Sequence, residues 1–181
     1  MQQEASRKLG FTLKKTMSVA QGLYEGVNVG SKGTVGLITY MRTDSTRISE
    51  DARHMAKEYI EKNYGDNYYL NRFYKTNENA QDAHEAIRPS NLSHIDDVMS
   101  SVSSDEQKLY TLILNRFLAS QMEVAIYDTT KIKIEVGNYV FYVNGSTIKF
   151  DGFMKLYIEG KDEKNKADED ENYEQNVNLP D

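Results

Sequence analysis

The hydrophobic period of the chain changes once, near residue 125, and this change limits the possible folds more than any other feature. Before that point apolar residues recur every three or four positions, as on one face of a helix. After it, apolar and polar residues alternate from Lys131 to Val136, as in a half-exposed strand. The sequence therefore predicts an α+β fold in which a mostly helical domain is followed by antiparallel strands.

The helices of the first part are indicated by their start and stop signals. Hydroxyl side chains are favoured N-caps, and a glycine after the last periodic residue is a favoured stop. A short helical pattern over residues 81–88 is ended by Pro89. The other predicted helices are 2–9 ending at Gly10, Thr12 to Gly26, Ser49 to Gly65, and Ser104 to about Met122, where Ser104 and Gln107 have the spacing of a capping box.

Two dipeptides divide the strand region. Gly137-Asn138 and Asn144-Gly145 are both typical of tight hairpin turns, so we expect an antiparallel meander whose last strand ends at Ile158. Because so small a sheet is marginally stable alone, we expect it to belong to a larger sheet or arch. The predicted organisation is a helical domain over 1–123, arch strands over 124–160, and an acidic, flexible or incompletely paired tail over 161–181.

Composition excludes several classes of protein. The chain has no cysteine, which excludes disulfides and thiolate metal sites and fits a reducing cytoplasm. No apolar stretch approaches the roughly 18–20 residues of a membrane-spanning helix, and the first residues lack a secretory signal pattern. The loop over residues 30–34 lacks the order of a phosphate-binding P-loop, so we expect no nucleotide ligand.

The net charge of −6 is unevenly distributed. Residues 1–90 carry 13 basic and 11 acidic side chains, whereas the tail over 161–181 carries 3 and 8. An extended basic groove is therefore not visible, but a local phosphate site is compatible with the near-neutral body. We expect this chain alone to be a weak, salt-sensitive binder of DNA.

One segment combines the groups needed for phosphate chemistry. An apolar run leads into Tyr40 and Arg42, and hydroxyl residues follow. If the backbone is extended here, Tyr40 and Arg42 point to the same face, where a phenol and a guanidinium can meet around one phosphate. A tyrosine can store the energy of a broken phosphodiester in a phosphotyrosine bond.

Ionisation is the obstacle to that chemistry. A tyrosine with the ordinary pKa near 10 is phenolate in about one molecule in a thousand at neutral pH. Arg42 and Arg47 supply positive charge, but neither is a credible base. From these residues alone, the favoured interpretation of Tyr40 is a buried strand tyrosine followed by a turn and a well-capped helix.

Several motifs in order resemble bacterial type IA DNA topoisomerase I. Residues 37–46 (LITYMRTDST) are similar to the active-site segment of that family, and residues 82–89 (DAHEAIRP) are similar to its second signature. Further similar segments lie at 2–11, 15–26, 119–122 and 150–153. The resemblance covers about residues 2–160, and several separated motifs are far more specific than any one of them.

The resemblance implies roles for three residues. Tyr40 is the nucleophile that forms a 5′-phosphotyrosine link to one cut DNA strand. Arg42 holds the scissile phosphate and offsets its charge, and His84 helps to position DNA. From chemistry alone we add Asp44, which would orient Arg42 or His84, and three candidate DNA-backbone contacts: Ser45, Thr46 and Arg47.

The resemblance also implies what this chain lacks. Family members are several times longer and begin with a toprim domain, whose acidic cluster binds Mg²⁺ and supplies the general acid. No such cluster occurs here, and His84-Glu85 has no second ligand at helical spacing, so we expect no metal site in this chain. The expected partners are a single-stranded segment of negatively supercoiled DNA and the toprim and DNA-binding domains of the same protein, without ATP or a membrane.

Two other classes of function compete with this interpretation. A non-catalytic DNA- or protein-binding module would bury Tyr40 and satisfy its hydroxyl, whereas a nucleophile would lie on an accessible face. A tyrosine recombinase would need more arginines and histidines upstream of the tyrosine, where Arg7 is the one arginine present.

Overall fold

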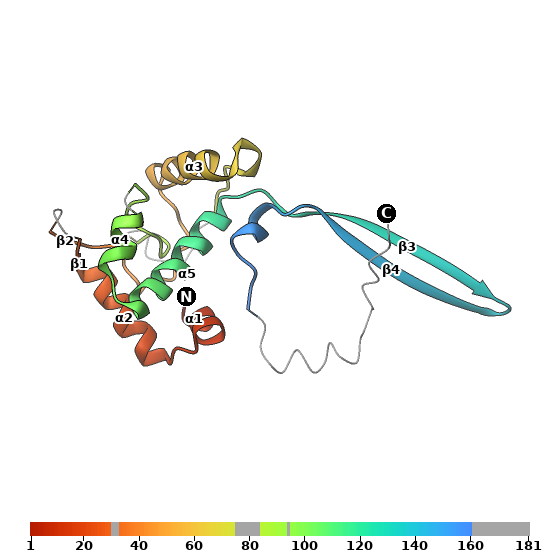
Figure 1. Cartoon of the computed structure of the whole chain (residues 1–181), viewed down its shortest axis with the longest axis horizontal. Coiled ribbons are helices and arrows are strands. Elements are labelled where there is room, and N and C mark those ends of the chain that lie inside the picture. Colours follow the sequence, from red (N-terminus) through yellow and green to blue (C-terminus); the bar gives the residue numbers. More distant parts are fainter. Residues whose placement is uncertain (30–32, 75–83, 94, 161–181) are drawn as a thin grey trace.

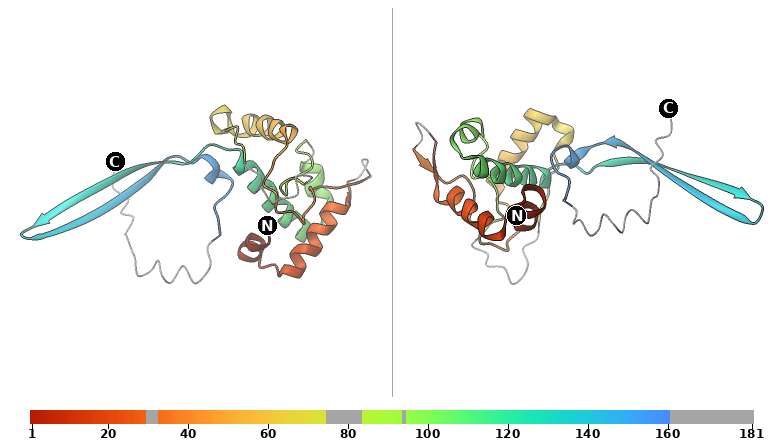
Figure 2. Two further views of the ribbon diagram at one scale, coloured as in Figure 1. Left: turned by 180° about the vertical axis from the view of Figure 1, so that it is seen from behind. Right: turned by 60° about the horizontal axis from the view of Figure 1, so that its bottom comes forward.

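The computed structural model describes residues 1–29, 33–74, 84–93 and 95–160. In these ranges five helices form one body, and a long hairpin extends away from it (Figures 1 and 2). The predicted tail over 161–181, part of the loop over 30–34 and the first residues of the segment 81–88 lie outside the described residues. The predicted α+β class is confirmed.

Local capping explains where the first three helices begin and end. α1 (Gln2–Leu9) ends at Gly10, which has a left-handed φ of 65°. The Thr12 side chain accepts a hydrogen bond from an amide of α2 (Leu13–Glu25), and the Ser49 side chain does the same for α3 (Glu50–Tyr64). Each cap satisfies an amide that the helix itself cannot pair, so these predicted boundaries are confirmed.

The fifth helix is the centre of the body. α5 (Ser104–Ser120) contacts α1 and α2 and buries most of its residues from Leu109 to Ala119. Its N-cap is Ser103, which shares a capping box with Glu106, one residue earlier than the predicted pair. The short helix α4 (Ile95–Ser101) was not predicted. None of the helices in the described ranges is long and apolar enough to span a bilayer.

The strand region forms one long hairpin rather than a three-stranded meander. β3 (Ile126–Val136) pairs antiparallel with β4 (Tyr139–Phe150) around the predicted turn at Gly137-Asn138. The second predicted turn is wrong, because Asn144 and Gly145 pair with Lys131 and Thr130. A turn there would leave the first half of β3 without backbone partners. Beyond β4 the chain forms a 3-10 turn, η3 (Gly152–Lys155), instead of a strand.

A second, much smaller hairpin lies in the glycine-rich loop after α2. β1 (Val27–Asn28) pairs with β2 (Thr34–Val35). Gly36 follows this hairpin and passes so close to the end of α2 that a Cβ atom there would lie 2.7 Å from the Tyr24 carbonyl oxygen. The Leu37 amide donates to the Leu23 carbonyl over 2.7 Å. This contact fixes the direction in which the following segment crosses the body.

The chain returning from the long hairpin is fastened to α1 and α5. The Tyr157 side chain is 4% exposed, and its hydroxyl donates to a Glu4 carboxylate oxygen over 2.7 Å. Lys8 and Arg116 lie over the Tyr157 ring, at 4.0 and 4.5 Å from its centroid. Because burial and the bond to Glu4 favour the neutral phenol, the pKa of Tyr157 rises to about 12.

This fastening predicts a pH-dependent contribution to stability from Glu4. Burial alone would raise its pKa, but the bonds from Tyr157 and the Gly160 amide, with Lys8, outweigh burial and lower it. A carboxylate with a lowered folded pKa stabilises the fold above its unfolded pKa of about 4.3 and loses that contribution as pH falls through the folded pKa.

We therefore expect Glu4→Gln to lower the free energy of unfolding above about pH 5 and the difference from the parent to narrow as pH falls below about 4. Chemical denaturation at a series of pH values measures this, with the exposed Glu58→Gln as control. A difference between Glu4→Gln and the parent that stays constant down to pH 3 would contradict the assignment.

Candidate active site

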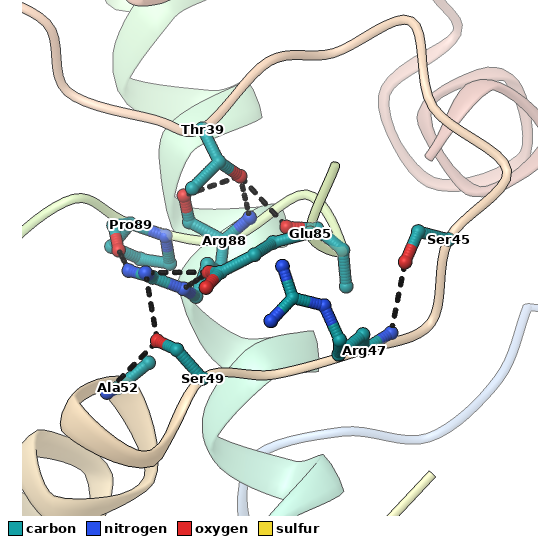
Figure 3. Close-up of polar contacts among 9 residues, drawn as sticks. Thr39, Ser45, Arg47, Ser49, Ala52, Glu85, Arg88 and Pro89 are labelled. Carbon is teal, nitrogen blue, oxygen red and sulfur yellow. Dashed lines mark hydrogen bonds and ion pairs between the residues drawn. The ribbon is translucent and has the colours of Figure 1, made fainter. Parts of the chain in front are cut away.

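The loop over residues 40–46 is held at both ends by one distant segment. On one side the Thr39 amide donates to the Arg88 carbonyl over 2.9 Å, and the Thr39 hydroxyl donates to the Ala86 carbonyl over 2.7 Å. On the other side the Ala86 amide donates to the Arg47 carbonyl over 2.8 Å. Figure 3 shows Thr39 and Arg47 on either side of this segment. We call these bonds, together with the bridge between Ile38 and Pro89, the clamp.

The clamp explains why the predicted helix over 81–88 is wrong in its described part. Residues 84–90 are irregular, with Pro89 in the bridge to Ile38. Their backbone groups bond to residues 37–39 and 47 instead of to one another. A helix this short has little stability of its own, so these tertiary bonds outweigh its local preference.

An ion pair inside the segment supports the clamp. Arg88 pairs with Glu85 over 2.6 Å, and the two side chains are 11% and 18% exposed. The same guanidinium donates to the Pro89 carbonyl over 2.9 Å and reaches the Ser49 hydroxyl at 3.5 Å (Figure 3). Arg88 therefore connects the clamp to the N-cap of α3. The opposite charges at i and i+3 were visible in the sequence, but their role was not predicted.

Tyr40 lies between two other aromatic rings. The Tyr24 ring meets it edge-on with centroids 5.3 Å apart, and the His84 ring is tilted by 44° with centroids 5.1 Å apart. Tyr40 itself is half-buried, and its hydroxyl bonds to none of the described residues. The three rings come from α2, from the loop over 40–46 and from the segment that the clamp holds. No local signal in the sequence indicated the contact between Tyr24 and Tyr40.

Tyr40 and Arg42 line one open hollow, although the extended backbone on which the prediction from their spacing depended is absent. The backbone bends at 39–42 instead of continuing as a strand, yet both side chains border the same space. Arg42 is exposed and forms no hydrogen bond or ion pair with the described residues. The opposite wall belongs to α2 and consists of Met17, Ser18, Gln21, Gly22 and Glu25. Gln21 donates a hydrogen bond to Glu25 there.

The remaining predicted site residues do not join this hollow. Asp44, Ser45 and Thr46 line a different one, on the side of Arg116 and Tyr157. Asp44 bonds to neither Arg42 nor His84. The Ser45 hydroxyl accepts the Arg47 amide over 3.2 Å, so it shapes the loop.

Arg47 contributes its backbone to the clamp, and its side chain lies beside the clamped segment (Figure 3). Its Nε atom is buried without a partner among the described residues. The structure thus brings together Tyr40, Arg42 and His84, and separates them from the four residues assigned by chemistry alone: Asp44, Ser45, Thr46 and Arg47.

In the ranges that the structure covers, no three His, Cys, Asp or Glu side chains lie close enough to hold a metal ion. The arrangement instead offers a phenol and a guanidinium at one open space, with an imidazole against the phenol ring. A phosphodiester fits it, because the guanidinium can bind two non-bridging oxygens while the phenol faces phosphorus.

Comparison with known proteins gives two similarities. The model of the DNA topoisomerase family matches residues 1–180. The solved structure of full-length topoisomerase I from Thermotoga maritima is 40% identical in sequence and has a TM-score of 0.74, over 90% of this chain. The match covers 26% of that structure's chain, so the present chain spans about a quarter of its length. The resemblance to bacterial topoisomerase I is confirmed.

The supporting ion pair gives a stability prediction. We expect Arg88→Met to lower the free energy of unfolding by about 1–3 kcal/mol, because a carboxylate and a carbonyl lose their charged partner in a mostly buried place. Glu61→Gln is the matched control, since Glu61 and Lys57 form an exposed pair 3.6 Å apart and should contribute less than about 0.5 kcal/mol. Urea denaturation measures both, and equal stability of the two variants would contradict the role of Arg88.

Proposed function

The chain belongs to the DNA topoisomerase family, and from this premise we propose that it carries the strand-cleaving tyrosine, Tyr40, of an ATP-independent type IA enzyme. One observation carries the proposal. The half-buried Tyr40 borders the same open hollow as Arg42, whose guanidinium has no partner among the described residues, and it has His84 against its ring. A tyrosine with only a packing role would be expected to bury its ring and to bond its hydroxyl to a neighbour.

The proposed cleavage step uses Tyr40 as the nucleophile and Arg42 as its electrostatic partner. The Tyr40 oxygen attacks phosphorus, an O–P bond forms, and the bond from phosphorus to the 3′ oxygen of the neighbouring nucleotide breaks. The phenol gives up its proton to solvent water in the open hollow, and the leaving 3′ oxygen takes one from an acid outside this chain. Arg42 offsets charge on the phosphate as the bond order changes. His84 is placed to orient Tyr40 and the bound strand.

The reverse of this step reseals the strand. The free 3′ hydroxyl attacks the 5′-phosphotyrosine and restores the phosphodiester, so bond energy is conserved and ATP is not needed. Between the two steps another strand passes through the gap, driven by strain in negatively supercoiled DNA. The substrate is thus a single-stranded segment of such DNA. Mg²⁺ belongs in this scheme to the toprim domain, outside the chain, and would supply charge at the phosphate from there.

The long hairpin has a mechanical part in the proposal. We assign residues 1–123 to the domain that carries the tyrosine and 124–160 to the arch on which that domain moves. One face of the hairpin carries exposed Ile132, Ile134, Phe141 and Tyr139. A two-stranded sheet with such a face is marginal alone, which supports its place in a larger arch. The cytoplasmic location expected from the sequence is part of the same proposal.

The first test is the isolated chain. We expect it neither to cleave nor to relax supercoiled plasmid in the presence of Mg²⁺, because the acidic half of the active site is not in these residues. Agarose gel electrophoresis after prolonged incubation measures relaxation. Relaxation that disappears in Tyr40→Phe would contradict the expectation of inactivity.

The second test restores the missing part. Mixed with a separately produced toprim portion of the same protein, the chain should form a covalent adduct with a labelled single-stranded oligonucleotide. Tyr40→Phe should form none, and Arg42→Gln should form it at least about 100-fold more slowly, as expected for loss of a charge that stabilises the transition state. Tyr139 is 72% exposed at the hairpin tip, so Tyr139→Phe is the matched control and should form the adduct like the parent.

Mass spectrometry of the digested adduct identifies the modified residue. An adduct on any other tyrosine, or one that survives Tyr40→Phe, would overturn the assignment of the nucleophile.

A further inference from the structure

A second hollow, on α3, combines cations with aromatic rings. Arg53, His54 and Lys57 face it from α3, and the segment after the helix contributes Tyr69, Asn71 and Phe73. Figure 1 shows α3 and its following turn on the edge of the helical body. This hollow shares no residue with the one that Tyr40 and Arg42 line.

Two of its cations are paired with rings. The Arg53 guanidinium lies 3.9 Å from the centroid of the Phe73 ring, and the Lys57 ammonium lies 6.0 Å from that of Tyr69. The Arg53 guanidinium also donates to the Asn71 side-chain oxygen over 3.2 Å. Its position is therefore fixed before any ligand arrives, which reduces the entropy that binding would cost.

Phe73 is unusually open for a phenylalanine. It is 69% exposed although the Arg53 guanidinium lies over its ring. An exposed ring next to a fixed guanidinium is the combination that binds unpaired bases, because the base stacks on the ring while the cation meets the neighbouring phosphate. A duplex cannot use the ring in this way, since its base faces are stacked on one another.

The local charge also suits a phosphate backbone. The residues that line the hollow include one carboxylate, Glu50, against two permanent cations. The ion pair between Lys57 and Glu61 is 3.6 Å long and exposed, so a phosphate can replace Glu61 at little cost. Among the residues that line the hollow, the two permanent cations thus outnumber the carboxylate by one once Glu61 is displaced, in a chain whose net charge is −6.

We propose that this hollow binds single-stranded nucleic acid, with an unpaired base stacked on Phe73 and the adjoining phosphates on Arg53 and Lys57. That the strand is DNA rests on the proposed function, whereas the stacking and the charge do not. This hollow would hold the strand at one point while Tyr40 acts on the same strand at another.

The test measures binding of a fluorescent oligothymidine of twelve nucleotides to the intact 181-residue chain by anisotropy at low salt. Phe73→Leu should weaken single-strand binding about tenfold, as expected for the loss of one base–ring stack, and leave binding of a duplex of equal length unchanged. Lys57→Gln should weaken both and reduce the slope of log K against log salt by about 0.7.

Matched controls lie on the hairpin. Phe141 is 56% exposed, and the Lys149 side chain is exposed as well. The variants Phe141→Leu and Lys149→Gln should both bind like the parent. Circular dichroism checks that each variant is folded. Unchanged single-strand affinity in Phe73→Leu, or an equal loss for single strand and duplex, would overturn the proposal.

Repeating the Phe73→Leu measurement in a chain that already carries Arg42→Gln separates this inference from the proposed function. In Arg42→Gln, the remaining single-strand affinity should still fall about tenfold on Phe73→Leu, because the two hollows share no residue. If the covalent adduct forms on Tyr40 but Phe73 has no effect on binding, this inference alone fails. If Phe73 governs binding but no adduct forms with the toprim portion, the proposed function alone fails.

Discussion

The site depends on a few backbone hydrogen bonds between segments that are far apart in the sequence. Thr39 bonds to Ala86 and Arg88, which lie 47 and 49 residues later. The Arg47 carbonyl closes the other end of the same loop. A loop fixed at both ends cannot move its side chains independently of the segment that holds it. His84, at the start of that segment, is therefore brought against Tyr40 by the same bonds that position Tyr40.

The second fixed point is the end of α2. Gly36 lets the chain pass so close to α2 that its neighbour Leu37 bonds to the Leu23 carbonyl. This places the Tyr24 ring against Tyr40 and makes α2 the far wall of the hollow that Arg42 shares. One helix and two irregular segments thus converge on one phenol. The rigid helices beneath them give that convergence its precision.

Local chemistry made four of the five helices in the described ranges predictable, and distant pairing made much of the rest unpredictable. The side chains of Thr12 and Ser49 cap their helices by accepting a hydrogen bond from the amide three residues later. The sequence signal for each cap therefore lies within a few residues. By contrast, the segment from His84 has a helical pattern in the local sequence. Its hydrogen-bond partners lie near Thr39 and Arg47, and the local sequence does not show them. Asn144-Gly145 likewise has the sequence of a turn, but both residues lie within β4 and pair with β3.

The site itself was predictable in part. The spacing of Tyr40 and Arg42 placed them together, and the family resemblance added His84. Asp44 was assigned by charge alone, and a bend in the loop turns it to another hollow. Supporting residues such as Thr39 and Arg88 carry no chemical signature, so they became visible only in the contacts of the folded chain.

We propose that Tyr40, Arg42 and His84 form one phosphate-binding site before any other domain is present. Titration of the labelled chain with a thymidine dinucleotide, followed by NMR of these three side chains, is the decisive test. We expect the Tyr40 ring, the Arg42 Nε–H and the His84 ring all to shift along a single binding curve. A shift of Arg42 alone, with both rings unmoved at saturation, would contradict it.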